Sequence, residues 1–366
     1  MKLKKTVRQL HLWLGLLVGL IFSVSAITGA FLAFEEELEP VVYPQLYFCP
    51  TPPPQAERLP LDTLFHRAQQ HLGKIGIHQV NIQDQETNSA YIFRSKGGRL
   101  DQYTIAVNPY TADVQFVIQG KKHFFTVIED LHRNLLMGEI GKSISGAACL
   151  SYIIILITGL ILWRPKNQKI RKKRLKIKWD AKFKRLNWDI HAVGGFYSFP
   201  LVLLMVITAL TWSYTWFNDG IFYVMDGKPR EMFTTNFDLP HTRGVHPPIE
   251  KSYQEALRLM PYEGQMNISL PTGDADAIYI SREIADAPIP NMVDYHLFNR
   301  YTGELVHTEL YKDQTKGMKL RRMMFPLHTG SIGGLTTKIM YTIICLYATS
   351  LPFTGFWIWL GRKKKK

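Results

Sequence analysis

Four long runs of apolar residues divide the sequence. They cover residues 12–34, 144–163, 192–217 and 335–360. Each run is about 20 residues or longer and carries almost no charge, and at about 1.5 Å per residue such a helix crosses a hydrocarbon layer of roughly 30 Å. The pattern therefore predicts four transmembrane helices.

The first run follows a basic amino-terminal stretch, which is also the pattern of a secretory signal with a cleavage site at residues 23–26. The run continues to Phe34, however, beyond the usual signal core of about 7 to 15 residues. A membrane-spanning helix is therefore favoured over a cleaved signal.

The polar stretches after the first and third runs have the same order of predicted elements. In each, helical spacing is followed by short runs that alternate apolar and polar residues, which is typical of strands on a half-buried sheet. The helices are predicted at 59–72 and 249–260, the strands at 78–82, 90–94, 103–107, 266–270, 277–281 and 295–298, and the turns at 108–114 and 299–306. Each stretch is predicted to form a small α+β module of one helix on a short antiparallel sheet.

The sequence thus uses one plan twice, and we expect an α-helical integral membrane bundle of four transmembrane helices with two α+β modules and an internal two-fold sequence repeat. The predicted segments are 1–34 (tail and first span), 35–128 (first module), 129–163 (histidine motif and second span), 164–188 (basic loop), 189–217 (third span), 218–324 (second module) and 325–366 (histidine motif, fourth span and basic tail). The pairs Thr28-Gly29, Thr158-Gly159 and Thr354-Gly355, with Thr208-Ala209 in the remaining span, are interpreted as small residues that let helices approach closely.

Basic residues are concentrated next to the spans. Residues 2–8, 164–188 and 362–366 hold 21 of the 44 lysines and arginines, and Asp180 is the only acidic residue among them. The positive-inside rule places these segments, and hence both termini, in the cytoplasm and the two modules on the opposite side. A nucleic-acid site in the run 171–174 is the alternative, but the run lies close to a span and matches a membrane-surface segment, so no nucleic-acid partner is expected.

Four of the twelve histidines occupy equivalent places in the repeat. His11 and His191 lie at the cytoplasmic ends of spans one and three, and His132 and His328 lie just before spans two and four. A single histidine at a membrane interface is usually an amphipathic anchor, but four at repeat-related positions indicate a function.

Haem iron is the partner that these histidines favour, because neutral imidazole ligates iron and an apolar bundle provides a dry slot for a porphyrin. Two ligands of one iron must lie at the same depth, so His11 should pair with His191 and His132 with His328. Zinc or copper is the competing interpretation, but neither pair has an obvious third ligand nearby. The three cysteines form no C-x-x-C or C-x-x-C-H motif, so a covalent haem attachment is not indicated.

Charged residues near the histidines are candidates for supporting roles. Arg133, Arg321 and Arg322 are predicted to meet the propionates of a haem on the outer side, and Arg164, Lys182 and Arg185 those of a haem on the cytoplasmic side; membrane anchoring is the alternative for all six. Asp130 and Asp189 are predicted to orient the neighbouring imidazoles.

These motifs together resemble the PepSY-associated transmembrane proteins, also called iron-regulated membrane proteins, which include the FoxB-type siderophore reductases. The resemblance rests on Leu10-His11-Leu12-Trp13-Leu14-Gly15, Asp130-Leu131-His132-Arg133-Asn134-Leu135, Trp163-Arg164-Pro165, His191 and Pro326-Leu327-His328-Thr329-Gly330. It implies a bacterial inner-membrane protein with PepSY-like periplasmic modules and haem b, with two haem groups expected, one for each histidine pair. The resemblance further implies that electrons pass outward to a ferric siderophore or other ferric chelate.

The sequence has no G-x-G-x-x-G segment that would bind a flavin or nicotinamide cofactor. A membrane quinol or a separate reductase is therefore expected to supply the electrons. Two other classes of function remain open. In one, the modules bind a peptide, protease or siderophore and the spans are anchors without redox activity. In the other, the chain transports iron or haem, but the spans carry almost no acid or base at mid-membrane, which disfavours an ion pathway. Tyr43, Tyr47, His241, Arg243 and His246 are candidates for lining a substrate entrance.

Overall fold

The computed structural model describes the chain except residues 1, 84–88, 166, 231–247, 272–276 and 364–366. The described residues form two compact units, which are treated separately below. The helical unit comprises residues 1–34, 128–220 and 324–366, and the sheet unit comprises residues 35–127 and 221–323.

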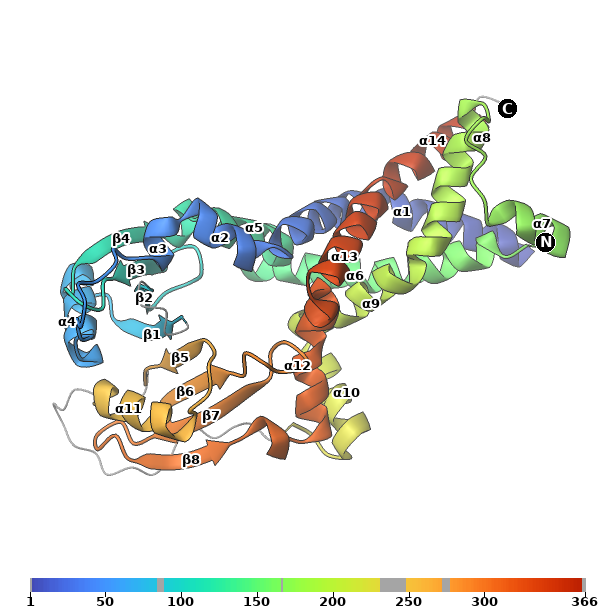
Figure 1. Cartoon of the computed structure of the whole chain (residues 1–366). Helices are drawn as coiled ribbons and strands as arrows, with labels where there is room; N and C mark the ends of the chain where they lie inside the picture. Colours follow the sequence, from blue (N-terminus) through green and yellow to red (C-terminus); the bar gives the residue numbers. More distant parts are fainter. Residues whose placement is uncertain (1, 84–88, 166, 231–247, 272–276, 364–366) are drawn as a thin grey trace. The chain divides into compact units, whose positions relative to one another are not determined.

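Four helices or helix pairs of the helical unit are long and apolar enough to cross a membrane (Figure 1). They are α1 (Lys2–Leu32), α6 (Gly138–Trp163), the stretch of α8 (Phe183–Asp189) and α9 (Gly195–Ser213), and the stretch of α13 (Gly334–Thr349) and α14 (Leu351–Lys363). Leu17, Leu20, Ile140 and Ile343 are more than 60% exposed on this unit. Such apolar side chains are unfavourable in water and favourable against lipid tails. The prediction of four transmembrane helices is confirmed, and the chain is a multi-pass membrane protein.

Two of the spans depart from a regular helix. The fourth run, predicted as one helix, ends its first helix at Thr349 and resumes at Leu351, just before Pro352, whose ring removes a backbone donor and disfavours helical geometry in the residue before it. In the third span, Ile190–Gly194 forms a turn of π-helix between α8 and α9. This turn holds His191, and turns of this kind are frequent at functional sites.

The sheet unit contains one continuous antiparallel sheet of eight strands. The strands are β1 (Ile77–Ile82), β2 (Tyr91–Ser95), β3 (Tyr103–Val107), β4 (Val114–Gln119), β5 (Met266–Ser269), β6 (Ile278–Glu283), β7 (Val293–Phe298) and β8 (Leu305–Glu309). Their order is β4-β3-β2-β1-β5-β6-β7-β8, and β1 pairs with β5 through Asn81 and Asn267. The two stretches predicted as separate modules therefore share one sheet, to which each contributes four strands.

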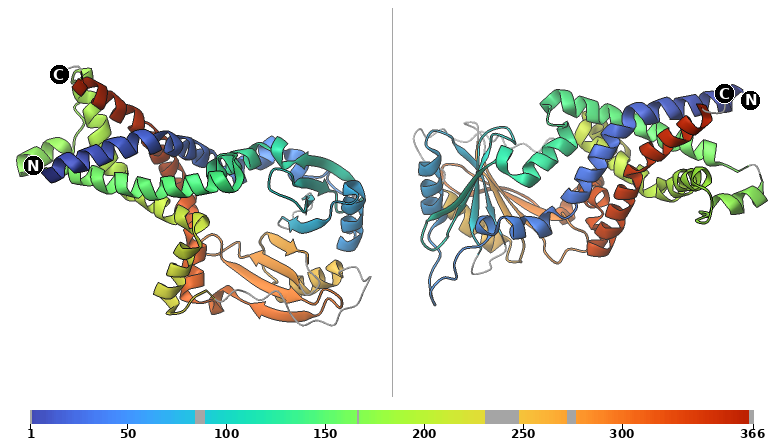
Figure 2. Two further views of the ribbon diagram at one scale, coloured as in Figure 1. Left: turned by 180° about the vertical axis from the view of Figure 1, so that it is seen from behind. Right: turned by 90° about the horizontal axis from the view of Figure 1, so that it is seen from above.

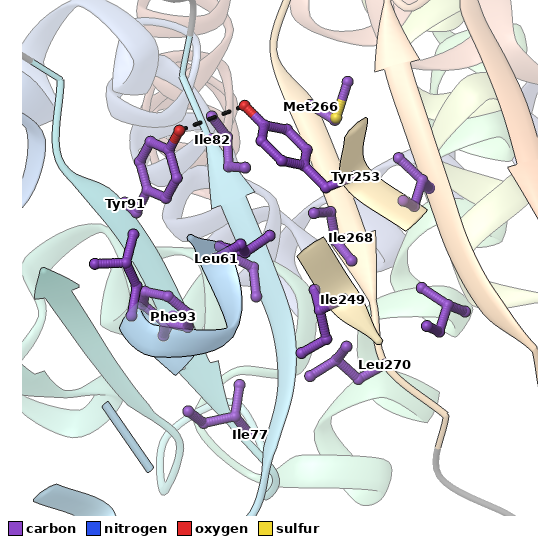
Figure 3. Close-up of a cluster of buried hydrophobic side chains, with 14 of the residues drawn as sticks. Leu61, Ile77, Ile82, Tyr91, Phe93, Ile249, Tyr253, Met266, Ile268 and Leu270 are labelled. Carbon is purple, nitrogen blue, oxygen red and sulfur yellow. Dashed lines mark hydrogen bonds between the residues drawn. The ribbon is translucent and has the colours of Figure 1, made fainter. Parts of the chain in front are cut away.

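Two helices cover one face of this sheet, α4 (Leu61–Leu72) from the first stretch and α11 (Ile249–Leu259) from the second. Side chains from both halves form one hydrophobic cluster, including Phe93 and Ile268 (Figure 3). Phe93, Ile268 and Leu64 are completely buried in it. Figure 3 also shows the hydroxyl groups of Tyr91 and Tyr253, 3.4 Å apart across the boundary between the halves. The buried cluster thus joins the two halves into one core.

The helices α4 and α11 cap each other. Asp62 Oδ1 accepts hydrogen bonds from the backbone N–H groups of Ile249 and Glu250, at 3.1 and 3.3 Å. In return, Glu250 Oε2 accepts one from the N–H of Leu61, at 2.5 Å. Because the first N–H groups of a helix have no partner within the helix, each acid satisfies groups that would otherwise be unpaired in the other half.

The remaining helices connect or flank these parts (Figure 2). Helices α2 (Glu35–Val42) and α3 (Pro44–Tyr47) belong to the sheet unit, where Leu46 packs on Ile92 and Ala106. Helices α5 (Phe124–Asn134) and α12 (Lys316–Thr329) end in the helical unit, α10 (Thr215–Asp226) follows the third span, and α7 (Gln168–Arg174) lies between α6 and α8. The histidines predicted to precede spans two and four are thereby carried by α5 and α12.

Candidate functional site: two histidine pairs in the helical unit

The structure brings the four predicted histidines together as two pairs. The ring centroids of His11 and His191 are 6.2 Å apart with an angle of 84° between the ring planes. Those of His132 and His328 are 6.1 Å apart with an angle of 64°. The partners within each pair are those expected from the sequence, and all four residues belong to the helical unit.

Each imidazole is held by a neighbouring helix through the same pair of contacts. Its Nδ1 lies within hydrogen-bond distance of one backbone carbonyl oxygen and of the threonine hydroxyl three residues further along that helix. The contacts are to Ile155 and Thr158 for His11 (3.1 and 3.0 Å), Leu351 and Thr354 for His191 (3.1 and 3.0 Å), Ser25 and Thr28 for His132 (2.9 and 3.1 Å), and Met205 and Thr208 for His328 (2.9 and 3.0 Å).

These contacts determine which ring nitrogen carries the proton. A carbonyl oxygen only accepts hydrogen bonds, so Nδ1 must be the N–H group. The threonine hydroxyls can accept as well, because each donates its own proton to a carbonyl of its helix; Thr158, for example, donates to Ile154 O at 2.7 Å. Among the described residues, no Nε2 of the four histidines has a hydrogen-bond partner. Each pair therefore offers two Nε2 lone pairs.

Glycines provide the space for three of the rings. A Cβ atom added to Gly29 would lie 3.0 Å from Cε1 of His132, and Gly159 and Gly355 stand in the same relation to His11 and His191, at 3.2 and 3.1 Å. In the sequence, the recurring Thr-Gly pairs were interpreted as helix-packing residues. The structure gives them a more specific role, since the threonine holds an imidazole and the glycine makes room for it.

The two aspartates predicted to orient the imidazoles do not do so. Asp189 is completely buried, and its Oδ2 accepts a hydrogen bond from Arg185 Nε at 2.8 Å. Asp130 accepts one from the side-chain amide of Asn134, at 2.8 Å. This part of the prediction is wrong because residues two positions apart on a helix do not face each other, and each Nδ1 is directed to another helix.

The predicted propionate contacts remain a prediction, and the structure places those residues as follows. Arg133 Nη1 donates to Glu129 Oε1 at 3.0 Å, one turn earlier in α5. Arg321 and Arg322 lie in the part of α12 that belongs to the sheet unit. Of the residues predicted to lie near the His11–His191 pair, Arg164 directly follows α6 and Lys182 directly precedes α8. Arg185 is bound to Asp189, as described above.

Aromatic residues line the bundle around the pairs. Trp212 lies 5.3 Å from His328, centroid to centroid, and Phe22 stacks on Tyr152 at 3.6 Å. Their sequence pattern gives no signal of a site, because aromatic side chains in a span are more often part of its packing or of an interfacial belt.

The residues proposed for a substrate entrance are not assembled by the described part of the structure. Tyr43 stacks on His123 with 4.6 Å between centroids, and the hydroxyl of Tyr47 donates to Glu39. His241, Arg243 and His246 lie outside the described residues.

The geometry of the pairs fits the two axial positions of a haem iron. With a nitrogen–metal bond of about 2 Å on each side and about 1 Å from each nitrogen to its ring centre, two axial imidazoles have centroids about 6 Å apart. Both observed separations match this value. No group of three or more His, Cys, Asp or Glu side chains among the described residues is arranged to hold a metal ion, whereas a haem iron requires only two ligands from the protein.

Comparison with known proteins agrees with this architecture. No curated protein matches the chain in sequence. A family model described as the PepSY-associated TM region matches residues 8–362, which include all four spans, the eight strands and the four histidines. The chain therefore belongs to the family of the PepSY-associated TM region.

Proposed function

We propose that the protein is a di-haem b transmembrane reductase that carries electrons from the cytoplasmic or quinol side to ferric siderophores, or other ferric chelates, in the periplasm of a bacterium. The observation that carries the proposal is the two histidine pairs, with ring centroids 6.2 and 6.1 Å apart and each Nδ1 held by a neighbouring helix, so that Nε2 is left to bind a metal. The orientation follows from the basic residues beside the spans, which favour cytoplasmic termini and a periplasmic sheet unit.

The two sites lie at different depths of one bundle. Helix α1 contributes His11 to one pair and holds His132 of the other through Thr28. Those positions are 17 residues apart in the sequence, which corresponds to about 25 Å along a helix. A cofactor at each level would therefore support electron transfer across most of the hydrocarbon layer.

The residues of the chain have defined tasks in this proposal. A bound haem b supplies one-electron chemistry between ferric and ferrous iron. The imidazole Nε2 atoms would hold the haem iron, and the carbonyl and threonine acceptors hold each Nδ1–H so that the ring keeps its tautomer and orientation. In the overall reaction, one quinol releases two electrons and two protons and becomes a quinone, while two ferric chelates each gain one electron. The ferrous product binds hard oxygen ligands more weakly, which releases the iron for uptake.

The first test is the absorption spectrum of the detergent-purified full chain, oxidised and dithionite-reduced, together with its haem content. We expect low-spin b-type spectra and two haems per chain in the wild type, and one haem lost or perturbed in each of His11→Ala and His132→Ala. His66→Ala, an exposed histidine on α4, is the matched control and should keep both haems. Reduction of a ferric siderophore by quinol-loaded vesicles is then the activity assay.

A colourless wild type that cannot be reconstituted with haem would overturn the redox proposal. In that case the alternative is a periplasmic binding or regulatory module, for a peptide, protease or siderophore, with four helices as its anchor. The continuous sheet with its common core is the feature that would serve such a function.

A further inference from the structure

A group of polar side chains in the sheet unit lies around the first half of α12, on the face of the sheet opposite α11. The guanidinium carbon of Arg322 is 4.6 Å from the ring centroid of Tyr295, and the ring of Tyr279 is 5.0 Å from that of Tyr295. Tyr295 and Phe298 lie three positions apart on β7, so their side chains are on opposite faces of the sheet. Phe298 belongs to the buried core, and Tyr295 therefore points away from it.

Arg322 is held firmly but uses few of its donors. Its Nε donates to Gln314 Oε1 at 3.1 Å, and its backbone carbonyl accepts from Asn291 Nδ2 at 3.0 Å. Among the described residues, the terminal Nη groups of Arg322 have no hydrogen-bond acceptor. The side chain is therefore fixed at one edge of its guanidinium, with the opposite edge available.

Gln314 supplies a second unsatisfied donor. Its side-chain oxygen must face Arg322, because Nε of arginine only donates, and this directs the Nε2 amino group elsewhere. That nitrogen is buried and has no hydrogen-bond partner in the described structure, and the residue is only 7% exposed. A buried donor without an acceptor is costly, so the Gln314 nitrogen is placed to donate to an acceptor that enters the site.

The surroundings are electropositive. Burial lowers the pKa of both Arg321 and Arg322, and the charge of Arg230 lowers each of them further. Two carboxylates face the same region. Glu283 raises the pKa of Arg322 and also accepts a hydrogen bond from the N–H of Asn291. Glu309 is the second carboxylate, and its pKa is raised by burial. The positive charges of three arginines thus stand against the negative charges of two carboxylates.

We propose that Arg322 and Gln314, assisted by Arg230 and Arg321, form a binding site for an oxyanion, namely a carboxylate or phosphate group. The free edge of a guanidinium presents parallel N–H groups that match two oxygens of such a group, and the Gln314 amino group adds a donor beside them. Tyr295 provides an aromatic surface beneath the pair. The oxyanion has two natural sources: a soluble ligand, such as the carboxylate of a metal chelate, or the phosphate of an anionic lipid headgroup.

This site needs no haem, so its test is independent of the redox proposal. The full chain in a neutral detergent is titrated with citrate or inorganic phosphate at constant ionic strength set by chloride, because non-specific screening would otherwise mimic binding. The thermal midpoint is followed, with calorimetry for affinity. A second arm compares nanodiscs of phosphatidylglycerol with nanodiscs of phosphatidylcholine.

Three variants make the test specific. Arg322→Gln should weaken anion binding at least tenfold. Gln314→Glu places a carboxylate in the site, so it should raise the thermal midpoint without any ligand and abolish the response to anions. Arg300→Gln removes an arginine that stacks on Tyr301 at 5.4 Å outside the group, and it should behave as the wild type.

The arms separate the outcomes. A midpoint raised by citrate or phosphate supports a soluble ligand, and one raised only by phosphatidylglycerol supports a lipid phosphate; in both cases the effect must be lost in Gln314→Glu. If no anion raises the midpoint of the wild type above that in chloride, or if Gln314→Glu destabilises the protein and leaves anion binding intact, the proposal is overturned.

Discussion

The threonine contacts to the imidazoles lead to a quantitative prediction. Thr28→Val together with Thr208→Val removes one hydrogen-bond acceptor from each ligand of the His132–His328 pair and leaves the carbonyl acceptors in place. Valine has the shape of threonine and is tolerated in a helix held by packing. The substitution should therefore act on the site rather than on the fold.

The magnitude follows from the number of bonds lost. At about 1 kcal/mol for each hydrogen bond, two bonds are worth about 2 kcal/mol, or roughly a 30-fold loss of haem affinity at this site. The midpoint potential of the same haem should rise, because an imidazole with a weaker Nδ1–H acceptor donates less electron density to ferric iron. The other pair should keep its affinity and potential.

The assay is a haem titration of the reconstituted apoprotein combined with a potentiometric titration of both haems. Thr342→Val is the matched control, because the Thr342 hydroxyl is buried in the same bundle and makes no hydrogen bond with the described residues. Unchanged affinity and potential in the double variant, while His132→Ala loses a haem, would refute the role assigned to the threonines.

Three further predictions concern other contacts. Gly159→Val should displace the imidazole of His11, which lies 3.2 Å from the added Cβ, and should lower the haem content of that pair. Gly15→Val is the control, because a Cβ added there has no neighbouring atom within 4 Å. Pyridine-haem analysis of the two variants tests this prediction. Asp62→Ala and Glu250→Ala should each lower the stability of the sheet unit by about 1 kcal/mol, because each removes a helix cap. Denaturant unfolding measures this, and a midpoint equal to that of the wild type would contradict the reciprocal capping. Burial, and then the charge of Glu39, raise the pKa of Glu35 to about 7, so the folded state binds this proton more tightly than the unfolded state and stability should fall as pH rises from 4.5 to about 7. Glu35→Gln should flatten that dependence, and an unchanged pH profile would rule out this source.

The sequence predicted local elements better than their partners. Apolar runs and alternation located the spans, α4, α11 and most strands, because these patterns depend on near neighbours. The β1–β5 pairing was not predicted, since Asn81 and Asn267 lie on strands whose alternation is equally compatible with separate sheets. The break at Ser350 was missed although Pro352 was visible, because the apolar run continues through it.

The pairing of the histidines could be predicted from the sequence, but the threonine contacts that hold their rings could not. Depth in the membrane limits which ligands can meet, so the partners could be deduced from position along the spans. The threonine contacts could not, because a hydroxyl in an apolar helix ordinarily bonds to its own backbone, and all four also do so. The recurrence of Thr-Gly was a signal, but its meaning depends on which helix lies opposite. For Arg322 the sequence did not indicate the contacts with Tyr295 and Gln314, because these partners are distant in sequence or lie before the helix; its predicted propionate contact stays a prediction.

The joined sheet also has a consequence for biosynthesis. Asn81 and its partner Asn267 are separated by 186 residues, and two spans lie between them. At about 5 to 20 residues per second, the ribosome needs roughly 10 to 40 s to add the second strand after the first. During that interval β1 is an open edge, and α4 lacks the acid that caps its first turn. The first half of the sheet must therefore wait for the second, and a chaperone that shields strand edges could act between insertion of the second span and synthesis of β5.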